Sequence, residues 1–162
     1  MLIKGVNMKV ILDEKLYNEI WDRIYNDFSF FPASFINQTK RSKMKYKVYK
    51  LKNYWAEQEE KIVNSIFIEM SADDIYALDW QHDCFEFNPR EEVPLFYHYY
   101  DKDRDCNVYF PSYYPDGDFH FFISKDWSYG LLGHPWRKEI YVFGSELIKK
   151  IEAKIYELHL KK

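Results

Sequence analysis

Three segments of this chain repeat apolar residues at helical spacing, and most of the strand-like segments fall between the second and the third. The helical segments are 14–28, 54–70 and the stretch after Gly144, each with aromatic and aliphatic side chains on one face. The strand-like segments, rich in β-branched and aromatic residues, are 46–51, 75–87, 108–114, 119–124 and 139–143. Because helices and strands do not alternate regularly, this order predicts an α+β fold.

The predicted architecture is a single antiparallel sheet of five to six strands, with an N-terminal, a middle and a C-terminal helix packed on one face. Asp13 and Ser145 are placed to cap the first and the last helix. In the middle helix, residues 57–61 lie mostly opposite the apolar stripe and are expected to face water. The 162 residues contain no long linker and predict one domain, residues 1–162, in which an alternative start at Met8 would leave 1–8 as a loose tail.

The charge balance changes along the chain, although the net charge is only −3. Residues 40–52 hold seven Lys and Arg and no acid. Residues 69–126 hold fourteen Asp and Glu against four Lys and Arg, which gives a local charge of −10. Such a region repels phosphate backbones and attracts a basic partner or a cation, so a nucleic-acid ligand is not expected.

The sequence predicts a protein of the cytoplasm. No apolar run reaches ~18 residues, the length that a membrane-spanning helix needs, so no membrane association is expected. Residues 1–12 lack the long apolar stretch and the cleavage site of a secretory signal. Two cysteines, Cys84 and Cys106, do not make a disulfide framework.

The densest polar cluster is the segment Asp79-Trp80-Gln81-His82-Asp83-Cys84. If this segment continues a strand, alternation puts Asp79 and Gln81 on one face and Trp80 and His82 on the other. His82 is then open to three roles: a base, a metal ligand or a hydrogen-bonded core histidine.

A second cluster, residues 130–136, places His134 after two glycines and before a proline. This segment either holds His134 at the rim of a site or makes a tight connection into the last strand. An enzyme would use His82 and His134 as catalytic residues, with Asp79 or Asp116 as the orienting carboxylate. The spacing matches no known metal or cofactor motif, so no metal and no cofactor are expected.

Two further hypotheses treat the chain as a binding protein. In one, the acidic surface and exposed aromatic side chains bind a protein partner. In the other, three tryptophans line a pocket for a small molecule. The candidate binding residues are Trp80, Gln81, Asp118, Trp127 and Trp136.

Several segments together resemble an uncharacterised bacterial family, the domain of unknown function 2716. They are Leu78-Asp79-Trp80-Gln81-His82, Pro115-Asp116-Gly117-Asp118, Gly133-His134-Pro135-Trp136 and Val142-Phe143-Gly144, with Phe28-Ser29-Phe30-Phe31-Pro32 after the first helix. Their order and spacing agree with the family over nearly the whole chain. Ala33 and Arg137 depart from it: serine is expected at 33, and an acidic residue is typical at 137, which changes the charge beside His134.

The resemblance implies no particular activity. Small cytoplasmic α+β proteins of this kind are similar to the immunity proteins of bacterial toxin systems, by analogy of size, acidity and architecture. The leading hypothesis is therefore a non-enzymatic binding protein whose acidic surface covers a basic toxin, with an enzyme built on His82 and His134 as the alternative. The sequence leaves the oligomeric state open.

Overall fold

The computed structural model describes residues 8–30, 32 and 44–162, and these ranges contain three helices and ten strands. The helices are α1 (Glu14–Asp27), α2 (Glu57–Met70) and α3 (Ser145–Glu152). The strands are β1 (Met8–Val10), β2 (Tyr46–Leu51), β3 (Ile75–Asp79), β4 (Cys84–Phe87), β5 (His98–Asp101), β6 (Cys106–Tyr109), β7 (His120–Ser124), β8 (Gly130–His134), β9 (Glu139–Phe143) and β10 (Leu160–Lys161). No helix within these ranges is long and apolar enough to cross a membrane.

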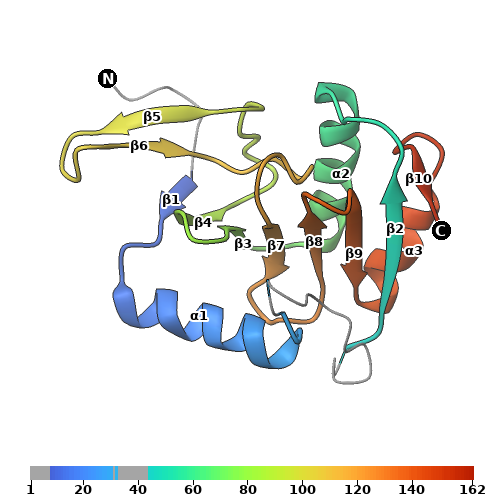
Figure 1. Cartoon of the computed structure of the whole chain (residues 1–162), viewed down its shortest axis with the longest axis horizontal. Helices are drawn as coiled ribbons and strands as arrows, with labels where there is room; N and C mark the ends of the chain where they lie inside the picture. The colour runs from blue at the N-terminus through green and yellow to red at the C-terminus, as the bar shows by residue number, and fades with distance from the viewer. Residues whose placement is uncertain (1–7, 31, 33–43) are drawn as a thin grey trace.

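Eight of the strands form one antiparallel sheet, in the order β1-β4-β3-β7-β8-β9-β2-β10 (Figure 1). The antiparallel α+β prediction is confirmed, but the prediction of five to six strands is wrong. The two edge strands β1 and β10 are too short to show a period in the sequence. In addition, segment 75–87 folds as two strands, β3 and β4, joined by a turn.

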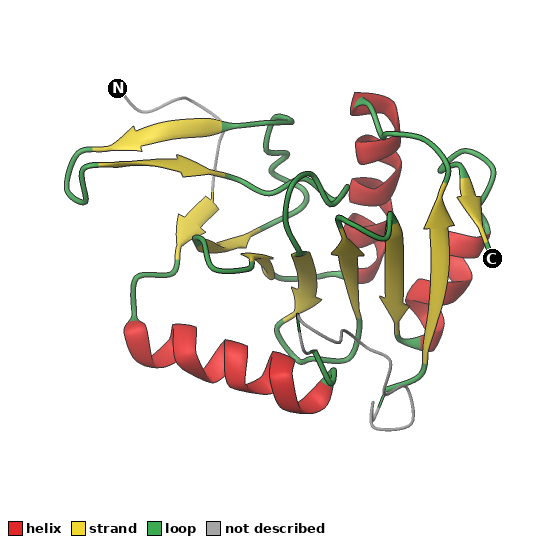
Figure 2. Ribbon diagram, in the orientation of Figure 1, coloured by secondary structure: helices red, strands yellow, loops and turns green. Residues whose placement is uncertain are grey.

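Helices cover both faces of this sheet, so the prediction of helices on one face is also wrong (Figure 2). Helix α1 packs on one face through Ile20, Trp21 and Ile24, and α2 and α3 pack on the other. Strands β7, β8 and β9 are buried almost throughout, because alternate side chains enter the two cores. This double burial removes the polar and apolar alternation that reveals a half-exposed strand.

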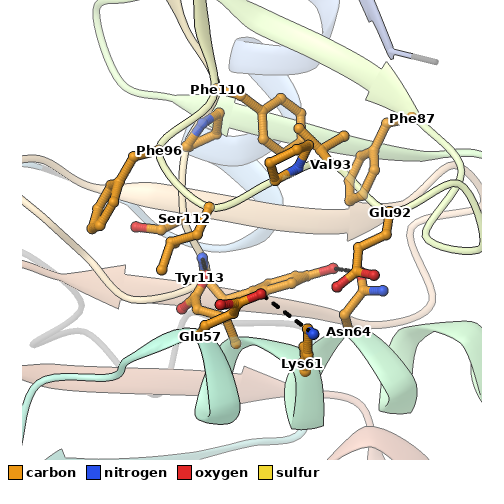
Figure 3. A pocket seen from close by; sticks show the side chains of 14 residues that line it. Glu57, Lys61, Asn64, Phe87, Glu92, Val93, Phe96, Phe110, Ser112 and Tyr113 are labelled. Atoms are coloured by element: carbon orange, nitrogen blue, oxygen red, sulfur yellow. Dashed lines mark hydrogen bonds and ion pairs between the residues drawn. The ribbon is translucent and has the colours of Figure 1, made fainter. Parts of the chain in front are cut away.

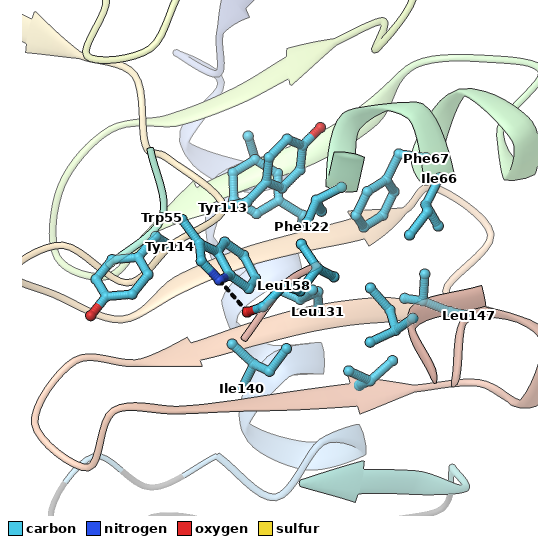
Figure 4. Packing of buried hydrophobic residues seen from close by; sticks show 14 of the residues in the cluster. Trp55, Ile66, Phe67, Tyr113, Tyr114, Phe122, Leu131, Ile140, Leu147 and Leu158 are labelled. Carbon is cyan, nitrogen blue, oxygen red and sulfur yellow. Dashed lines mark hydrogen bonds between the residues drawn. The ribbon is translucent and has the colours of Figure 1, made fainter. Parts of the chain in front are cut away.

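The core under α2 and α3 connects the middle helix to the C-terminal part of the chain (Figure 4). Phe67 of α2 and Leu147 of α3 pack with Phe122 and Leu131 from neighbouring strands of the sheet. Helix α3 ends at Glu152, and the chain then turns toward β10. The buried carbonyl of Leu158 accepts a hydrogen bond of 2.8 Å from the indole N–H of Trp55.

The helix caps follow the sequence only in part. Asp13 caps α1 as predicted, since its Oδ1 accepts from the backbone N–H of Leu16 at 3.0 Å. The cap of α3 is Gly144, at a φ of 97°, and Ser145 is already helical. The expected loose tail falls mainly on residues 1–7, outside the described ranges, whereas Met8 begins β1.

Strands β5 and β6 form a separate two-stranded hairpin that extends away from the large sheet (Figure 1). Residues 108–114 were expected to be one extended segment, but only the first two belong to β6. The hairpin is anchored at its base, where buried Val108 and partly buried Phe110 join the core beneath α2. At its tip, Arg104 forms an ion pair with Asp83, which lies in the turn between β3 and β4. This contact ties the hairpin to the large sheet.

Candidate functional site

The first candidate site lies where β3 ends at Asp79. The next residues form a turn rather than more strand, with Gln81 at a φ of 66° and the backbone N–H of His82 donating to the carbonyl of Asp79 at 2.9 Å. The predicted alternation of side chains across residues 79–84 is therefore wrong. The turn brings His82 back over Asp79, with His82 Nδ1 at 3.3 Å from Asp79 Oδ1.

A second histidine approaches Asp79 from the neighbouring strand. His120 is the cross-strand partner of Asp79, so their side chains lie on the same face. His120 Nδ1 lies 2.8 Å and 3.1 Å from the carbonyl oxygens of Ser112 and Tyr114, and because carbonyls only accept, Nδ1 carries a hydrogen. His120 Nε2 therefore faces Asp79 Oδ1, at 3.9 Å.

The turn before β7 adds a second carboxylate. Gly117, at a φ of 86°, lets the chain reverse so that Asp118 Oδ2 comes 3.5 Å from His82 Nδ1. The other oxygen of Asp118 accepts from the backbone N–H of Phe119 at 2.8 Å. Asp79, His82 and Asp118 each offer one ligand atom within 4.8 Å of the others. Asp116, in the same turn, is exposed to solvent.

The electrostatics of this cluster centre on Asp79. Its Oδ1 is buried and makes no hydrogen bond of good geometry within the described part of the chain. Burial raises the pKa of Asp79, while the positive charges that His120 and His82 can carry oppose the rise. The cluster opens to solvent through a cleft of about 490 Å³, whose walls include Tyr17 of α1 and Asn107 of the hairpin.

His134 does not join this cluster. Its neighbour Gly133 pairs with His120, so the side chain of His134 lies on the opposite face of the sheet. There it contacts the rings of Phe119 and Trp136, at centroid distances of 4.8 Å and 5.9 Å. Burial and then the charge of Arg137 lower the pKa of His134 to about 4, so the ring is neutral at pH 7.

The three predicted tryptophans lie at two ends of the sheet. Trp80 and Trp136 both contact Phe119 near the start of β7, at 5.6 Å and 5.0 Å. Trp127 follows the end of β7, where the guanidinium of Arg23 lies 4.5 Å from its ring centroid. The structure therefore does not bring all three to one pocket, although the exposed Gln81 lies beside Trp80 in a shallow cleft next to α1.

A second cavity was missed by the sequence reasoning. It lies between α2 and the segments 92–96 and 110–113, has a volume of about 200 Å³ and is drawn in Figure 3. Its upper wall is apolar and its helix side is polar (Figure 3). The side chains labelled there are Glu57, Lys61, Asn64, Phe87, Glu92, Val93, Phe96, Phe110, Ser112 and Tyr113.

Residues 57–61 were predicted to lie mostly opposite the apolar stripe, but Glu59 and Glu60 are buried, and Glu60 lines this cavity. Glu60 is buried because its two oxygens accept from the backbone N–H groups of Tyr113 and Tyr114, at 2.8 Å and 2.9 Å. Glu59 is buried because it accepts from the N–H of Ala56 and closes the first turn. Burial raises the pKa of Glu60 to about 7. The position of Glu59, three residues after the start of the helix, is a sequence signal for its capping role. No local sequence signal indicates that Glu60 is buried.

Comparison with known proteins gives a family without an assigned activity. The chain is similar to the uncharacterized protein YxiI of Bacillus subtilis (strain 168), with 44% identity over 80 residues. That match covers 49% of this chain and 44% of the length of YxiI. No solved structure matches the chain. The family model described as "Protein of unknown function (DUF2716)" matches residues 11–148, and the chain therefore belongs to this family, as the sequence segments predicted.

Proposed function

We propose that this chain is a non-enzymatic protein-binding domain whose partner presents a basic surface and an apolar anchor residue. The observation that carries the proposal is the cavity beside α2, which combines an apolar wall with carboxylates at its edge. Phe96 stands in this wall with 63% of its surface exposed, next to the apolar side chains that line the cavity. An apolar side chain of a partner would bury Phe96 and fill the cavity.

The surroundings of the cavity favour a cationic partner. Glu92 lies in its wall, and the only basic residue among those lining it, Lys61, is neutralised by Glu57 at 3.3 Å. The cavity borders the region of residues 69–126, whose local charge is −10. Such a field accelerates the approach of a positively charged protein and disfavours an acidic one.

The hairpin extends this surface. Tyr100 and Tyr109 are both more than half exposed and lie on the same side of the β5–β6 pair, together with His98. The tip alternates Asp101, Asp103 and Asp105 with two basic residues, and Asp101 is paired with Arg104 at 2.8 Å. Aromatic rings among carboxylates are well suited to the side chains of Arg and Lys, which bring both charge and apolar length.

The more specific form of the proposal is a toxin-neutralising role in the cytoplasm. A toxin that acts on an anionic substrate carries a basic active-site surface, and an acidic aromatic surface of this kind would cover it. The chain would then be an immunity protein, and growth rescue of cells that express a toxin encoded beside it would be the corresponding test.

The binding surface itself is tested with a random peptide library displayed on phage and panned against the full chain. We expect the selected peptides to be rich in Lys and Arg around one apolar residue, and to bind more weakly as salt increases. Phe96→Asp should abolish their binding. The matched control is Tyr156→Asp, since Tyr156 is 88% exposed but lies near the C-terminal end. Selection without basic residues, or equal binding by the Phe96 variant, would overturn the proposal.

A further inference from the structure

We propose that Asp79, His82 and Asp118 bind a divalent transition-metal ion, with Zn²⁺ as the best match to their donor atoms. This inference goes beyond the proposed protein-binding function and does not depend on it. One imidazole nitrogen and two carboxylate oxygens form a mixed donor set that suits Zn²⁺, Mn²⁺ or Co²⁺ better than Mg²⁺ or Ca²⁺, which prefer oxygen ligands alone.

The spacing of the donor atoms is that of ligands around a common ion. Two bonds of ~2.1 Å at the tetrahedral angle place their ligand atoms ~3.4 Å apart. His82 Nδ1 lies 3.3 Å from Asp79 Oδ1 and 3.5 Å from Asp118 Oδ2. A charged hydrogen bond between imidazolium and carboxylate would be shorter, at ~2.7–2.9 Å. The imidazole therefore sits between two carboxylates at distances that leave room for a shared ion.

A second observation comes from the buried side of the cluster. The Asp79 side chain is only about 14% exposed, and its buried Oδ1 makes no hydrogen bond of good geometry within the described ranges. Its nearest polar neighbours are the imidazole nitrogens of His82 and His120, at 3.3 Å and 3.9 Å. A buried carboxylate oxygen without a well-aligned donor is destabilising, and an ion bound to it would remove that penalty.

His120 points to the same conclusion. This histidine is about 95% buried, and its Nδ1–H is held by the carbonyl oxygens of Ser112 and Tyr114. Its Nε2 faces Asp79 Oδ1 at 3.9 Å, which is too far for a hydrogen bond.

The ion can reach the cluster from solvent. Asp79 and His82 line the cleft of about 490 Å³ between the β3–β4 turn and the hairpin. His82 is 62% exposed, and its Nδ1 also lies 3.0 Å from the carbonyl of Trp80. In the metal-free chain this nitrogen donates to Trp80, and metal binding exchanges that contact for the ion. The acidic region around the cleft raises the local concentration of cations.

The experiment is titration of the metal-stripped full chain with ZnCl₂, followed by calorimetry, with the absorption spectrum of bound Co²⁺ as a second readout. We expect one Zn²⁺ per chain and a Co²⁺ spectrum typical of mixed nitrogen and oxygen ligands. His82→Ala and Asp118→Asn should each weaken Zn²⁺ binding ~10-fold or more and alter that spectrum. His82 is 62% exposed and Asp118 is partly exposed, so these variants disturb the fold less than Asp79→Asn.

Two matched controls carry the same changes elsewhere. Asp116→Asn alters an exposed aspartate in the same turn as Asp118, and His98→Ala removes an exposed histidine of the hairpin. Both should bind Zn²⁺ like the unchanged chain. Absence of binding at ~1 mM ZnCl₂, or wild-type affinity in the His82 and Asp118 variants, would overturn the proposal. Peptide binding that depends on Phe96 would be unaffected by either result.

Discussion

His120 and His134 lie at the same end of neighbouring strands and are equally buried, but they face opposite sides of the sheet. His134 is surrounded by the rings of Phe119 and Trp136, and its environment keeps it neutral. His120 faces the carboxylate of Asp79 and holds two backbone carbonyls. The difference teaches that burial alone does not separate a structural histidine from one in a polar site. The two kinds of histidine are separated by the group that the ring contacts. That group depends on the face of the sheet to which the side chain points.

The largest expected effect that sharpens this contrast is the pH dependence caused by His134. Its folded-state pKa of about 4 lies below the ordinary value of ~6.5 in the unfolded chain. The neutral ring therefore contributes stability that is complete above pH ~6.5 and is lost as the pH falls toward 4, by roughly 3 kcal/mol. Urea denaturation of the wild-type chain and of His134→Phe at pH 7 and pH 4 measures this difference.

Comparison with His134→Phe separates the pH dependence caused by His134 from that caused by other titrating groups. Glu60 has a folded-state pKa raised to about 7, so its contribution falls as the pH rises from ~4.5 to 7, with the opposite sign. Glu60→Gln is therefore the control whose pH profile should change in the other direction. Identical acid sensitivity of the wild-type chain and His134→Phe would show that His134 is not held neutral by its burial.

A matched pair of substitutions tests the contrast at pH 7. His120→Phe leaves the carbonyl oxygen of Ser112 without the imidazole donor and puts an apolar ring against Asp79, so it should destabilise the fold by about 2 kcal/mol. The carbonyl of Tyr114 keeps the hydroxyl of Ser112 as a donor, at 2.6 Å. His134→Phe keeps a ring among rings and loses only the contact in which Nδ1 accepts from the N–H of Arg137, together with the remaining polar contacts of the imidazole. It should cost less than ~1 kcal/mol. Equal losses in denaturant midpoint would contradict the comparison.

Gly133 precedes His134 in β8 and is the cross-strand partner of His120. A smaller loss of stability is expected when it is substituted. A Cβ at this position would lie 2.6 Å from the ring of Pro115, which cannot give way by rotating. Gly133→Ala should therefore destabilise the chain by about 1 kcal/mol, because crowding exceeds the gain from a stiffer unfolded chain. Pro115→Ala in the same chain should restore part of that loss, which a double-mutant cycle of unfolding free energies measures. Additive losses would show that the two residues do not crowd each other.

The sequence predicted the helices and the antiparallel order of the fold because both leave a periodic pattern of side chains. The stripes of α1, α2 and α3, the cap at Asp13 and the antiparallel order all follow from side-chain spacing and local hydrogen bonding. The short edge strands and the two covered faces do not, since a strand buried on both sides loses its alternation.

The candidate site was predicted only in part for a related reason. Asp79 and His82 were selected from one polar segment, and Asp118 was selected separately, but the turn at Gln81 that brings His82 over Asp79 was read as strand. His120 was hidden among aromatic residues, and only the register of β3 against β7 places it beside Asp79. Pairing between distant strands has no signature in the spacing of either one.

The smallest expected effect concerns His82, which shares Asp79 with His120 but lies at the surface. Because His82 is 62% exposed, His82→Ala should change the stability of the metal-free chain by no more than ~0.5 kcal/mol. The same variant should lose any stabilisation by Zn²⁺, because a ligand that binds only the folded chain stabilises it by mass action. Thermal unfolding with and without ZnCl₂ measures both quantities. A metal-free chain that unfolds much more easily without His82 would mean that this imidazole, like His120, holds the fold, and the distinction between a supporting and a ligating histidine around Asp79 would fail.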